Sequence, residues 1–283
     1  MKLLVVVGHP LGHSMSPVMH NASLAAMDLK HEYRYEARPL LKDELPALVE
    51  SIRTGALEGA NITIPYKTEV MTHLTTISEE GLAVGSVNTL YRNDDGVTGC
   101  NTDIEGFDEA LREQDVDPRG LSATILGAGG AAKAVAFALA EAGVRRLDIL
   151  NRTQVKAEEL ATAIERGRNI EIRVGALPTS KHELQESDLL VNCTPVGMRD
   201  HSINGTPLRG SLLRKELVVM DLVYNPLRTR FLKEAEEAGC KTIDGSGMLV
   251  HQGAASLELW TGREPPIEIM RGAVLEALGG RHE

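Results

Sequence analysis

Short apolar runs alternate with longer amphipathic stretches along the first part of the chain. The runs predict strands, because a strand buried on both faces of a sheet is apolar throughout, and the amphipathic stretches predict helices. Strands are expected at Leu3–Val7, Tyr33–Ala37, Ala60–Ile64, Val84–Tyr91 and Val97–Gly99, and helices at Ser16–Leu29 and Lys42–Arg53. The buried face of the first helix is expected to contain Val18, Met19, Ala22, Ala25 and Ala26.

The same alternation restarts near residue 103. Helices are expected at Ile104–Arg112, Ala131–Ala142 and Gln154–Ala163, and strands at Ala123–Leu126, Leu147–Leu150, Ile170–Val174, Asp188–Cys193, Leu217–Leu222 and Lys241–Ile243. Helices from Ser246 onward are expected to return to the first part. The pattern predicts two α/β domains with a cleft between them. One, of residues 1–102 and 246–283, has a mostly parallel sheet, and the other, of residues 103–245, is Rossmann-like.

Charge and composition narrow the choice of partners. The chain of 283 residues has a formal net charge of −10, which argues against a nucleic-acid partner because phosphate binding needs clustered Lys and Arg. Its three cysteines lack the spacing of a disulfide framework or a zinc site. No apolar run approaches the roughly 18 residues of a membrane span. We therefore expect a cytoplasmic protein with no membrane partner; the oligomeric state stays open, with a homodimer as the candidate assembly.

A glycine turn follows the first strand of the second domain. Gly127–Ala132 fits G-x-G-x-x-A between a β-branched strand and a helix of small residues. In dinucleotide-binding folds the first glycine permits the tight turn, the second lets the backbone approach a pyrophosphate, and the small third position allows close helix packing. The helix N-terminus then favours the phosphate charge. The alternative is that these glycines serve only the geometry of the turn and bind no ligand. The complete βαβ pattern around them favours the dinucleotide-binding interpretation.

The end of the next strand indicates which dinucleotide is bound. NAD enzymes usually place Asp or Glu there to accept from the ribose 2′-hydroxyl, whereas this strand ends in Asn151-Arg152-Thr153. A guanidinium favours the 2′-phosphate of NADP. We expect Arg152 to select NADP, with hydrogen bonds from Asn151 and Thr153. Asn151 or Thr153 could instead cap the following helix.

Polar residues also follow predicted strands in the first domain. Ser14 and Ser16 precede a helix, where their hydroxyls could bind a carboxylate or simply cap the helix, although one serine is enough for a cap. Lys67 follows one strand end, and Asp103 follows another and could itself be a cap. If both ends face one cleft, Lys67 and Asp103 form a cation–carboxylate pair able to hold a hydroxyl and move its proton.

Three histidines near the N-terminus raise the question of a metal site. The spacing of His9, His13 and His20 fits no helical pair of ligands, and no Cys or carboxylate lies close in sequence to complete a site. No metal is therefore expected.

A series of short motifs runs through nearly the whole chain in a fixed order. They are Gly8–Asn21 (G-x-P-L-x-H-S-x-S-P-x-x-H-N), Asn61–Lys67, Val87–Thr89, Gly99–Gly106 (G-x-N-T-D-x-x-G), Gly127–Ala132, Asn151–Thr153, Asn192–Met198, Asp221–Thr229 (D-L-V-Y-N-P-x-x-T) and Gly245–Gln252. In this order they resemble the shikimate dehydrogenase family. Tyr66 stands where His or Phe is more usual, so the resemblance does not determine which side chain forms the edge of the pocket. Cys100 also differs from the residues often found at its position, and we expect it to be buried and inert.

The resemblance implies the reversible, NADP-dependent reduction of 3-dehydroshikimate to shikimate, a step toward chorismate and the aromatic amino acids. It implies Lys67 and Asp103 as the catalytic pair. The implied contacts to this carboxylated polyol are Ser14, Ser16, Thr63, Asn88, Tyr224 and Gln252. The implied contacts to NADP are Gly127, Gly129, Gly130, Ala131, Asn151, Arg152, Thr153, Thr194, Met198, Val223 and Gly245.

Three other functions fit parts of the pattern. A dual quinate/shikimate dehydrogenase could use the same pocket. A methylenetetrahydrofolate dehydrogenase also has two domains and a cleft lysine, but the paired serines and Gln252 suit a small carboxylated polyol better. A catalytically silent NADP-binding regulator would have no need of Lys67 and Asp103.

The choice of cofactor can be tested directly. If Arg152 selects NADP through the 2′-phosphate, steady-state rates should strongly favour NADPH over NADH, because NADH lacks that group. Equal catalytic efficiency with both cofactors would contradict this role of Arg152.

Overall fold

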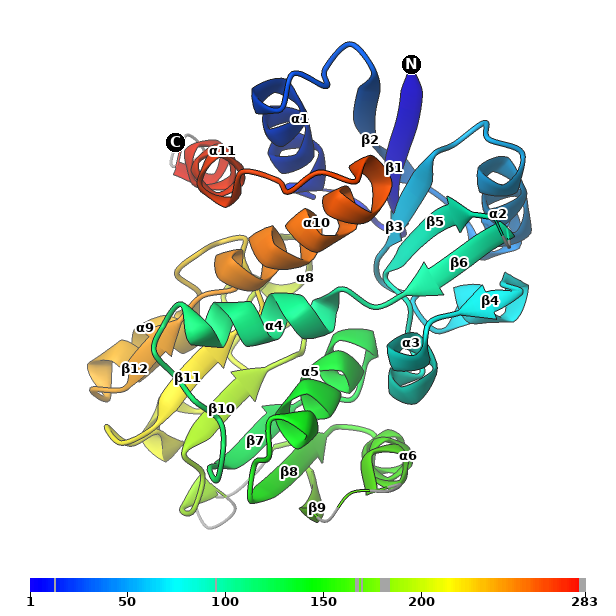
Figure 1. Ribbon diagram of the computed structural model, residues 1–283. Coiled ribbons are helices and arrows are strands. Elements are labelled where there is room, and N and C mark those ends of the chain that lie inside the picture. The colour runs from blue at the N-terminus through cyan, green and yellow to red at the C-terminus, as the bar shows by residue number, and fades with distance from the viewer. Residues whose placement is uncertain (13, 95, 166–167, 169, 179–183, 280–283) are drawn as a thin grey trace. The chain divides into compact units, whose positions relative to one another are not determined.

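The structure is a computed structural model that describes residues 1–279 except 13, 95, 166–167, 169 and 179–183. The chain divides into two compact units. The first consists of Met1–Gly106 with Leu249–Glu283, and the second of Phe107–Met248. Helices α4 (Asp103–Arg112) and α10 (Ser246–Thr261) each contain residues of both units (Figure 1).

The first unit is built on a mixed six-stranded sheet in the order β2-β1-β3-β5-β6-β4. Its strands are β1 (Lys2–Gly8), β2 (Tyr33–Pro39), β3 (Gly59–Ile62), β4 (Thr76–Ile77), β5 (Thr89–Asn93) and β6 (Gly96–Cys100). Only β5 runs against its neighbours, because a short turn joins it to β6 as a hairpin. All other pairings are parallel, as the sequence predicted.

Apolar side chains cover both faces of this sheet. On one face Val5, Val7 and Ile62 pack against α2 (Leu45–Arg53). On the other face Leu4, Val6 and Tyr35 pack against residues of α10, with α1 (Ser16–Ala26) beside them. The alternation along β1 is that of a strand buried on both sides.

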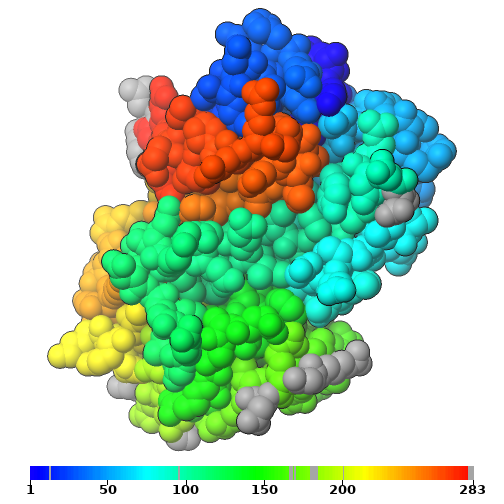
Figure 2. Space-filling view, viewed as in Figure 1, coloured from blue at the N-terminus to red at the C-terminus, as the bar shows by residue number. Residues whose placement is uncertain are grey.

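The C-terminal helices complete the first unit. Helix α11 (Ile267–Gly279) packs on α1, and Arg263 Nη1 donates to the carbonyl of Met27, 3.3 Å away. Figure 2 shows the orange and red surface of these last helices adjoining the blue surface of the first residues. The two ends of the chain therefore form one unit.

Several predicted elements of the first unit were wrong in detail. Residues 79–84 form helix α3 (Glu79–Val84), so the predicted strand Val84–Tyr91 begins too early. The Ser78 hydroxyl caps this helix, and Gly85 ends it at φ 65°. Residues 42–44 form a separate 3-10 turn, because Pro46 starts α2 afresh.

The predicted buried face of α1 was right for Met19 and wrong for three of its other members. Val18, Ala25 and Ala26 are exposed, whereas the buried residues are Ser16, Met19, His20, Ser23 and Leu24. The reason is aromatic packing: the His20 ring stacks on Tyr35 with centroids 4.1 Å apart. Burial lowers the pKa of His20 to about 3, so the ring is neutral in the fold.

The second unit contains an all-parallel sheet in the order β12-β11-β10-β7-β8-β9. Its strands are β7 (Ser122–Leu126), β8 (Arg146–Asn151), β9 (Glu171–Ala176), β10 (Leu189–Asn192), β11 (Val218–Asp221) and β12 (Lys241–Ile243), and its helices include α5 (Gly130–Glu141), α6 (Gln154–Glu165), α8 (Arg199–Ser202) and α9 (Arg230–Glu237). Counted along the chain, this is the 3-2-1-4-5-6 order of a Rossmann fold, which confirms the predicted class. Among the described residues, no helix has both the length and the apolar character that a membrane crossing requires.

The close approach of α10 to β3 can be tested at Gly59. A Cβ on Gly59 would lie well inside van der Waals distance of Trp260 Nε1, which donates to Leu90 O at 2.9 Å. We expect Gly59→Ala to lower the free energy of unfolding by about 1–3 kcal/mol through overpacking. Because Trp260 is the only tryptophan, its fluorescence emission should shift as well.

Gly272→Ala on α11 is the matched control, since a Cβ there meets nothing within 4 Å. It should leave the emission of Trp260 unchanged. Wild-type stability and emission in Gly59→Ala would contradict the packing described.

Candidate active site

Several loops of the first unit meet at one edge of its sheet. Strands β1, β3 and β6 run in the same direction, so their carboxyl ends lie at this edge, and antiparallel β5 begins there. The segments that follow or precede these ends carry Ser14, Lys67, Asn88 and Asp103. Sheet topology thus gathers polar residues that are far apart in sequence.

Lys67 and Asp103 form an ion pair at this edge. Lys67 Nζ donates to Asp103 Oδ2, and their side chains are only 14% and 6% exposed. The other carboxylate oxygen, Oδ1, accepts from Asn88 Nδ2 at 2.8 Å. Coulomb attraction is stronger in such a dry setting than in water, and each carboxylate oxygen has a donor.

The Asp103 carboxylate is available for this pairing because another side chain accepts the hydrogen bond from the first backbone N–H of α4. The side-chain oxygen of Asn101 accepts the backbone N–H of Asp103 at 3.0 Å, and Asn101 Nδ2 donates to Ser86 O at 2.8 Å. The alternative that Asp103 serves only as a helix cap is therefore not supported.

The turn that carries Lys67 is anchored to the core. Tyr66 is buried among the apolar residues beneath the sheet, so its ring faces the core and not the site. The carbonyl of Lys67 accepts from Val87 N at 2.8 Å. These contacts fix the backbone on both sides of the lysine.

The other expected substrate residues of this unit lie at the same edge or on α10. Asn88 Nδ2 is 3.3 Å from Gln252 Oε1, which connects α10 to the ion pair. Thr63 is half-buried directly after β3. Ser14 Oγ accepts the backbone N–H of Ser16 at 3.3 Å, and the N-cap position of α1 is Met15, which makes no side-chain cap. The Ser14 oxygen thus bonds the first N–H of α1, so the capping alternative holds for Ser14.

No metal centre is found in the described part of the chain. No group of three or more His, Cys, Asp or Glu there could hold an ion. His9 is exposed, His20 is stacked on Tyr35, and His13 lies outside the described residues. Cys100 is half-buried and not fully buried as expected, but burial of its thiol raises the pKa of that thiol to about 12, which disfavours the reactive thiolate.

The second unit has a glycine turn at the point where the strand order reverses. Gly127 has φ 110°, and a Cβ there would lie 3.2 Å from Thr194 Cγ2. The loops after β7 and β10 therefore touch, as they do at a topological switch point. A Cβ on Gly129 would meet nothing within 4 Å, so the backbone at the start of α5 is open to a ligand.

The end of β8 has the polar groups predicted for it. Arg152 and Thr153 are exposed, and Asn151 Nδ2 donates to Thr153 O at 2.8 Å. Gly127 N–H donates to Leu150 O at 2.8 Å, so the glycine turn and this strand end share one edge of the sheet. Gly130 and Ala131 lie in the first turn of α5.

Asp221 was not singled out from the sequence, and its carboxylate has a structural role in the second unit. It is fully buried at the end of β11, beside Asn192 at the end of β10. Its Oδ1 accepts from Asn192 Nδ2 at 2.8 Å and Val223 N at 3.0 Å, and Oδ2 accepts from Thr229 Oγ1 at 2.7 Å. The sequence did contain a signal: Asn192 and Asp221 each begin one of the family motifs near the end of a predicted strand.

This carboxylate organises the loops that carry the remaining expected cofactor residues. Asn192 Oδ1 accepts from Thr194 N at 3.0 Å and Oγ1 at 2.6 Å. A Cβ on Gly245 would collide with the backbone of Leu222, so only glycine fits beside Val223. Met198 and Tyr224 are half-buried in the same loops of the second unit.

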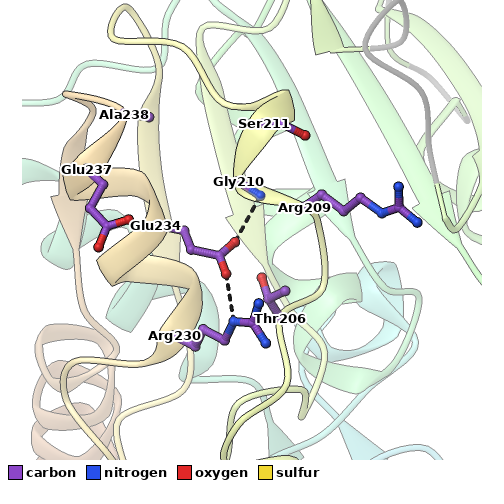
Figure 3. Close-up of a pocket in the computed structure, with 8 residues that line it drawn as sticks. All are labelled: Thr206, Arg209, Gly210, Ser211, Arg230, Glu234, Glu237 and Ala238. Atoms are coloured by element: carbon purple, nitrogen blue, oxygen red, sulfur yellow. Dashed lines mark hydrogen bonds and ion pairs between the residues drawn. The ribbon is translucent and has the colours of Figure 1, made fainter.

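A depression of about 490 Å³ elsewhere on this unit is not a candidate site. Residues 206–211 and helix α9 line it (Figure 3). Of the two carboxylates that line it, Glu234 is already engaged by Gly210 N at 2.9 Å and Arg230 Nε at 2.6 Å. These bonds tie the loop to the helix.

The ionisation of Asp221 predicts a pH effect on stability. Burial raises its pKa from 3.8 to about 6, against the lowering effect of its three donors. The folded state therefore holds the proton more tightly than the unfolded state, and stability falls as the pH rises from about 4 to about 6. Relative to wild type, Asp221→Asn should gain stability over this window in thermal unfolding experiments.

Asp117→Asn, at an exposed carboxylate of the same unit, serves as the control. A stability difference between wild type and Asp221→Asn that stays constant from pH 4 to pH 8 would count against a buried ionisable Asp221.

Comparison with known proteins agrees with the architecture. Three family models match: the shikimate dehydrogenase substrate binding domain at residues 6–90, shikimate / quinate 5-dehydrogenase at residues 109–222, and the shikimate 5′-dehydrogenase C-terminal domain at residues 245–275. The chain is 43% identical over 276 residues to the shikimate dehydrogenase (NADP(+)) of Methanopyrus kandleri, covering 96% of this chain and 94% of that protein.

Solved structures show the same similarity. A crystal structure of a shikimate dehydrogenase in complex with NADP+ matches with a TM-score of 0.91 and 38% identity, over 98% of this chain and 96% of that one. Shikimate 5-dehydrogenase from Thermus thermophilus, in complex with NADP(H) and shikimate, matches with a TM-score of 0.87 and 39% identity, over 98% and 100% of the two chains. The chain therefore belongs to the shikimate dehydrogenase family.

Proposed function

We propose that this chain catalyses the reversible, NADP-dependent reduction of 3-dehydroshikimate to shikimate. The observation that carries the proposal is the buried pair Lys67–Asp103, held by Asn88 at one edge of the first unit's sheet. A cation and a carboxylate in this arrangement suit proton transfer to an oxygen. Membership of the family, and relatives named as NADP-dependent shikimate dehydrogenases, support this reaction.

The second unit has the features that NADP requires. The open backbone at Gly129 and the start of α5 suit a pyrophosphate. Arg152 and Thr153 are exposed where a carboxylate would select NAD, and they suit the 2′-phosphate. We assign the nicotinamide half to the loops organised by Asp221, with contacts from Thr194, Met198, Val223 and Gly245.

The first unit offers groups that match a small carboxylated polyol. Ser14 lies just before α1 and Ser16 is its first residue, and both suit the carboxylate at this helix N-terminus. Thr63, Asn88 and Gln252 supply donors and acceptors for ring hydroxyls. We assign Tyr224, in the second unit, a further substrate contact from the family resemblance alone.

In the proposed mechanism Lys67 transfers the proton to and from the substrate oxygen, and Asp103 and Asn88 hold Lys67 in position. Bound NADPH supplies hydride chemistry to the ketone carbon. The Lys67 ammonium donates a proton to the substrate oxygen, becomes a neutral amine, and takes a proton back from solvent. Asp103 keeps the ammonium in place, and Asn88 keeps the carboxylate oriented. In the reverse direction the neutral amine accepts the proton of the hydroxyl.

Domain roles and setting follow from the same assignment. We propose a substrate domain of residues 1–102 and 246–283 and an NADP-binding domain of residues 103–245. We further propose that the enzyme acts in the cytoplasm, with a homodimer as the candidate assembly.

The proposal is tested by assaying shikimate and quinate with NADP and NAD. Shikimate with NADP should be the preferred combination, and Lys67→Ala should lower kcat by at least about 100-fold while changing KM much less. Lys30→Ala, at an exposed lysine of the same unit, should behave as wild type.

Near-normal turnover by Lys67→Ala would refute its catalytic role. Equal efficiency with quinate would make the enzyme a dual-specificity dehydrogenase, and no turnover of either compound would favour a non-catalytic NADP-binding regulator.

A further inference from the structure

A cluster of neutral polar side chains lies buried next to the ion pair. We call it the amide–hydroxyl network; its members are Tyr35, Asn61, Asn88, Thr89, Thr102 and Ser256, all in the first unit and all at most 7% exposed. They come from β2, β3, β5, the junction of β6 with α4, and α10. Buried polar groups at this density are stable only when their hydrogen bonds are made.

Ser256 lies at the centre of the network. Its hydroxyl donates to Gln252 O, one helical turn earlier, at 2.9 Å. Because a serine hydroxyl has one proton, its oxygen can act only as an acceptor toward the sheet. Asn61 Nδ2 at 3.0 Å, Thr89 Oγ1 at 2.8 Å and Thr102 Oγ1 at 3.1 Å surround it.

The network also determines which way the Asn88 amide faces. Its Oδ1 accepts from the backbone N–H of Thr102 at 2.8 Å, and a backbone N–H can only donate. Nδ2 must then face Asp103 Oδ1 at 2.8 Å. A reversed amide would set its oxygen against the carboxylate, so this orientation is the one that supports the ion pair.

The Thr102 hydroxyl connects Ser256 to this amide. It accepts from Asn88 Nδ2 at 2.9 Å, so its own proton needs another acceptor. Ser256 Oγ at 3.1 Å provides one, and the Thr89 hydroxyl, 2.8 Å away, likewise donates to Ser256 Oγ. Without the Ser256 oxygen, the protons of Thr102 and Thr89 must both turn to Asn88 Oδ1, at 3.2 and 3.0 Å, which already accepts the backbone N–H of Thr102.

We propose that Ser256 is a positioning residue for catalysis, acting through Thr102 and Asn88 on the carboxylate of Asp103. The inference rests on the proposed function, since it concerns the orientation of the same catalytic pair. Among the described residues, Ser256 makes no hydrogen bond to Lys67 or Asp103. Its effect on the ion pair is therefore transmitted by the network.

The test compares Ser256→Ala and Ser256→Cys with Ser23→Ala. Ser23 is an equally buried serine of the same unit whose hydroxyl contacts Met27 Sδ, outside the network. Loss of one neutral acceptor should lower kcat about 3- to 10-fold. KM for shikimate and for NADP should stay within about twofold, because substrate groups are not removed. The cysteine variant keeps the shape with a weaker acceptor and should show the same direction of change.

A second readout does not depend on turnover. In NMR spectra of the full chain, the side-chain amide protons of Asn88 should exchange with solvent faster in both Ser256 variants than in wild type and Ser23→Ala. Faster exchange together with the kcat-specific loss supports the inference. Unchanged Asn88 exchange, or a kcat equal to that of Ser23→Ala, overturns it. If wild type turns over neither shikimate nor quinate, the proposed function fails, and the exchange of Asn88 alone still decides the role of Ser256.

Discussion

A buried ion pair is costly unless every charged atom is supported, and this constraint shapes the first unit around Lys67 and Asp103. The carboxylate has the ammonium on one oxygen and an amide on the other. Supporting that amide requires further donors and acceptors, which come from three strands and a returning helix. The apolar layers on the sheet hold those strands, so core packing and the chemistry of the site are parts of one arrangement.

The second unit also buries a charged group, the carboxylate of Asp221, but as a single charge and not as an ion pair. Among the described residues Asp221 makes no ion pair with a cation, and its three neutral donors offset only part of its loss of hydration, so its pKa stays raised. In return it connects the ends of two adjacent strands to the loops that follow them. In both units a buried carboxylate therefore defines the geometry of loops at the carboxyl edge of a sheet.

The sequence predicted features that depend on local pattern. The parallel strands, the glycine turn and the polar residues at strand ends could be placed because periodicity and motif spacing determine them. Helix α3 was missed because six residues are too few to show a helical period. The inward face of α1 could not be foreseen, since it depends on the stacking of His20 with Tyr35. The role of Ser256 could not be predicted either, because it depends on a tertiary contact: its hydrogen-bond partner Asn61 is 195 residues away in the sequence.

The return of α10 after the second unit has a consequence for synthesis on the ribosome. Lys67 and Asp103 leave the ribosome early, but Gln252 and Ser256 follow only after all the strands of the second sheet. Until then the polar side chains that α10 covers lack a partner and are open to water. The second unit can thus complete its sheet during translation, whereas the first unit is completed only near the end of the chain. Truncation after residue 248 would leave a nascent chain whose ion pair keeps Asn88 but lacks the contacts that Gln252 and Ser256 make to the surrounding network.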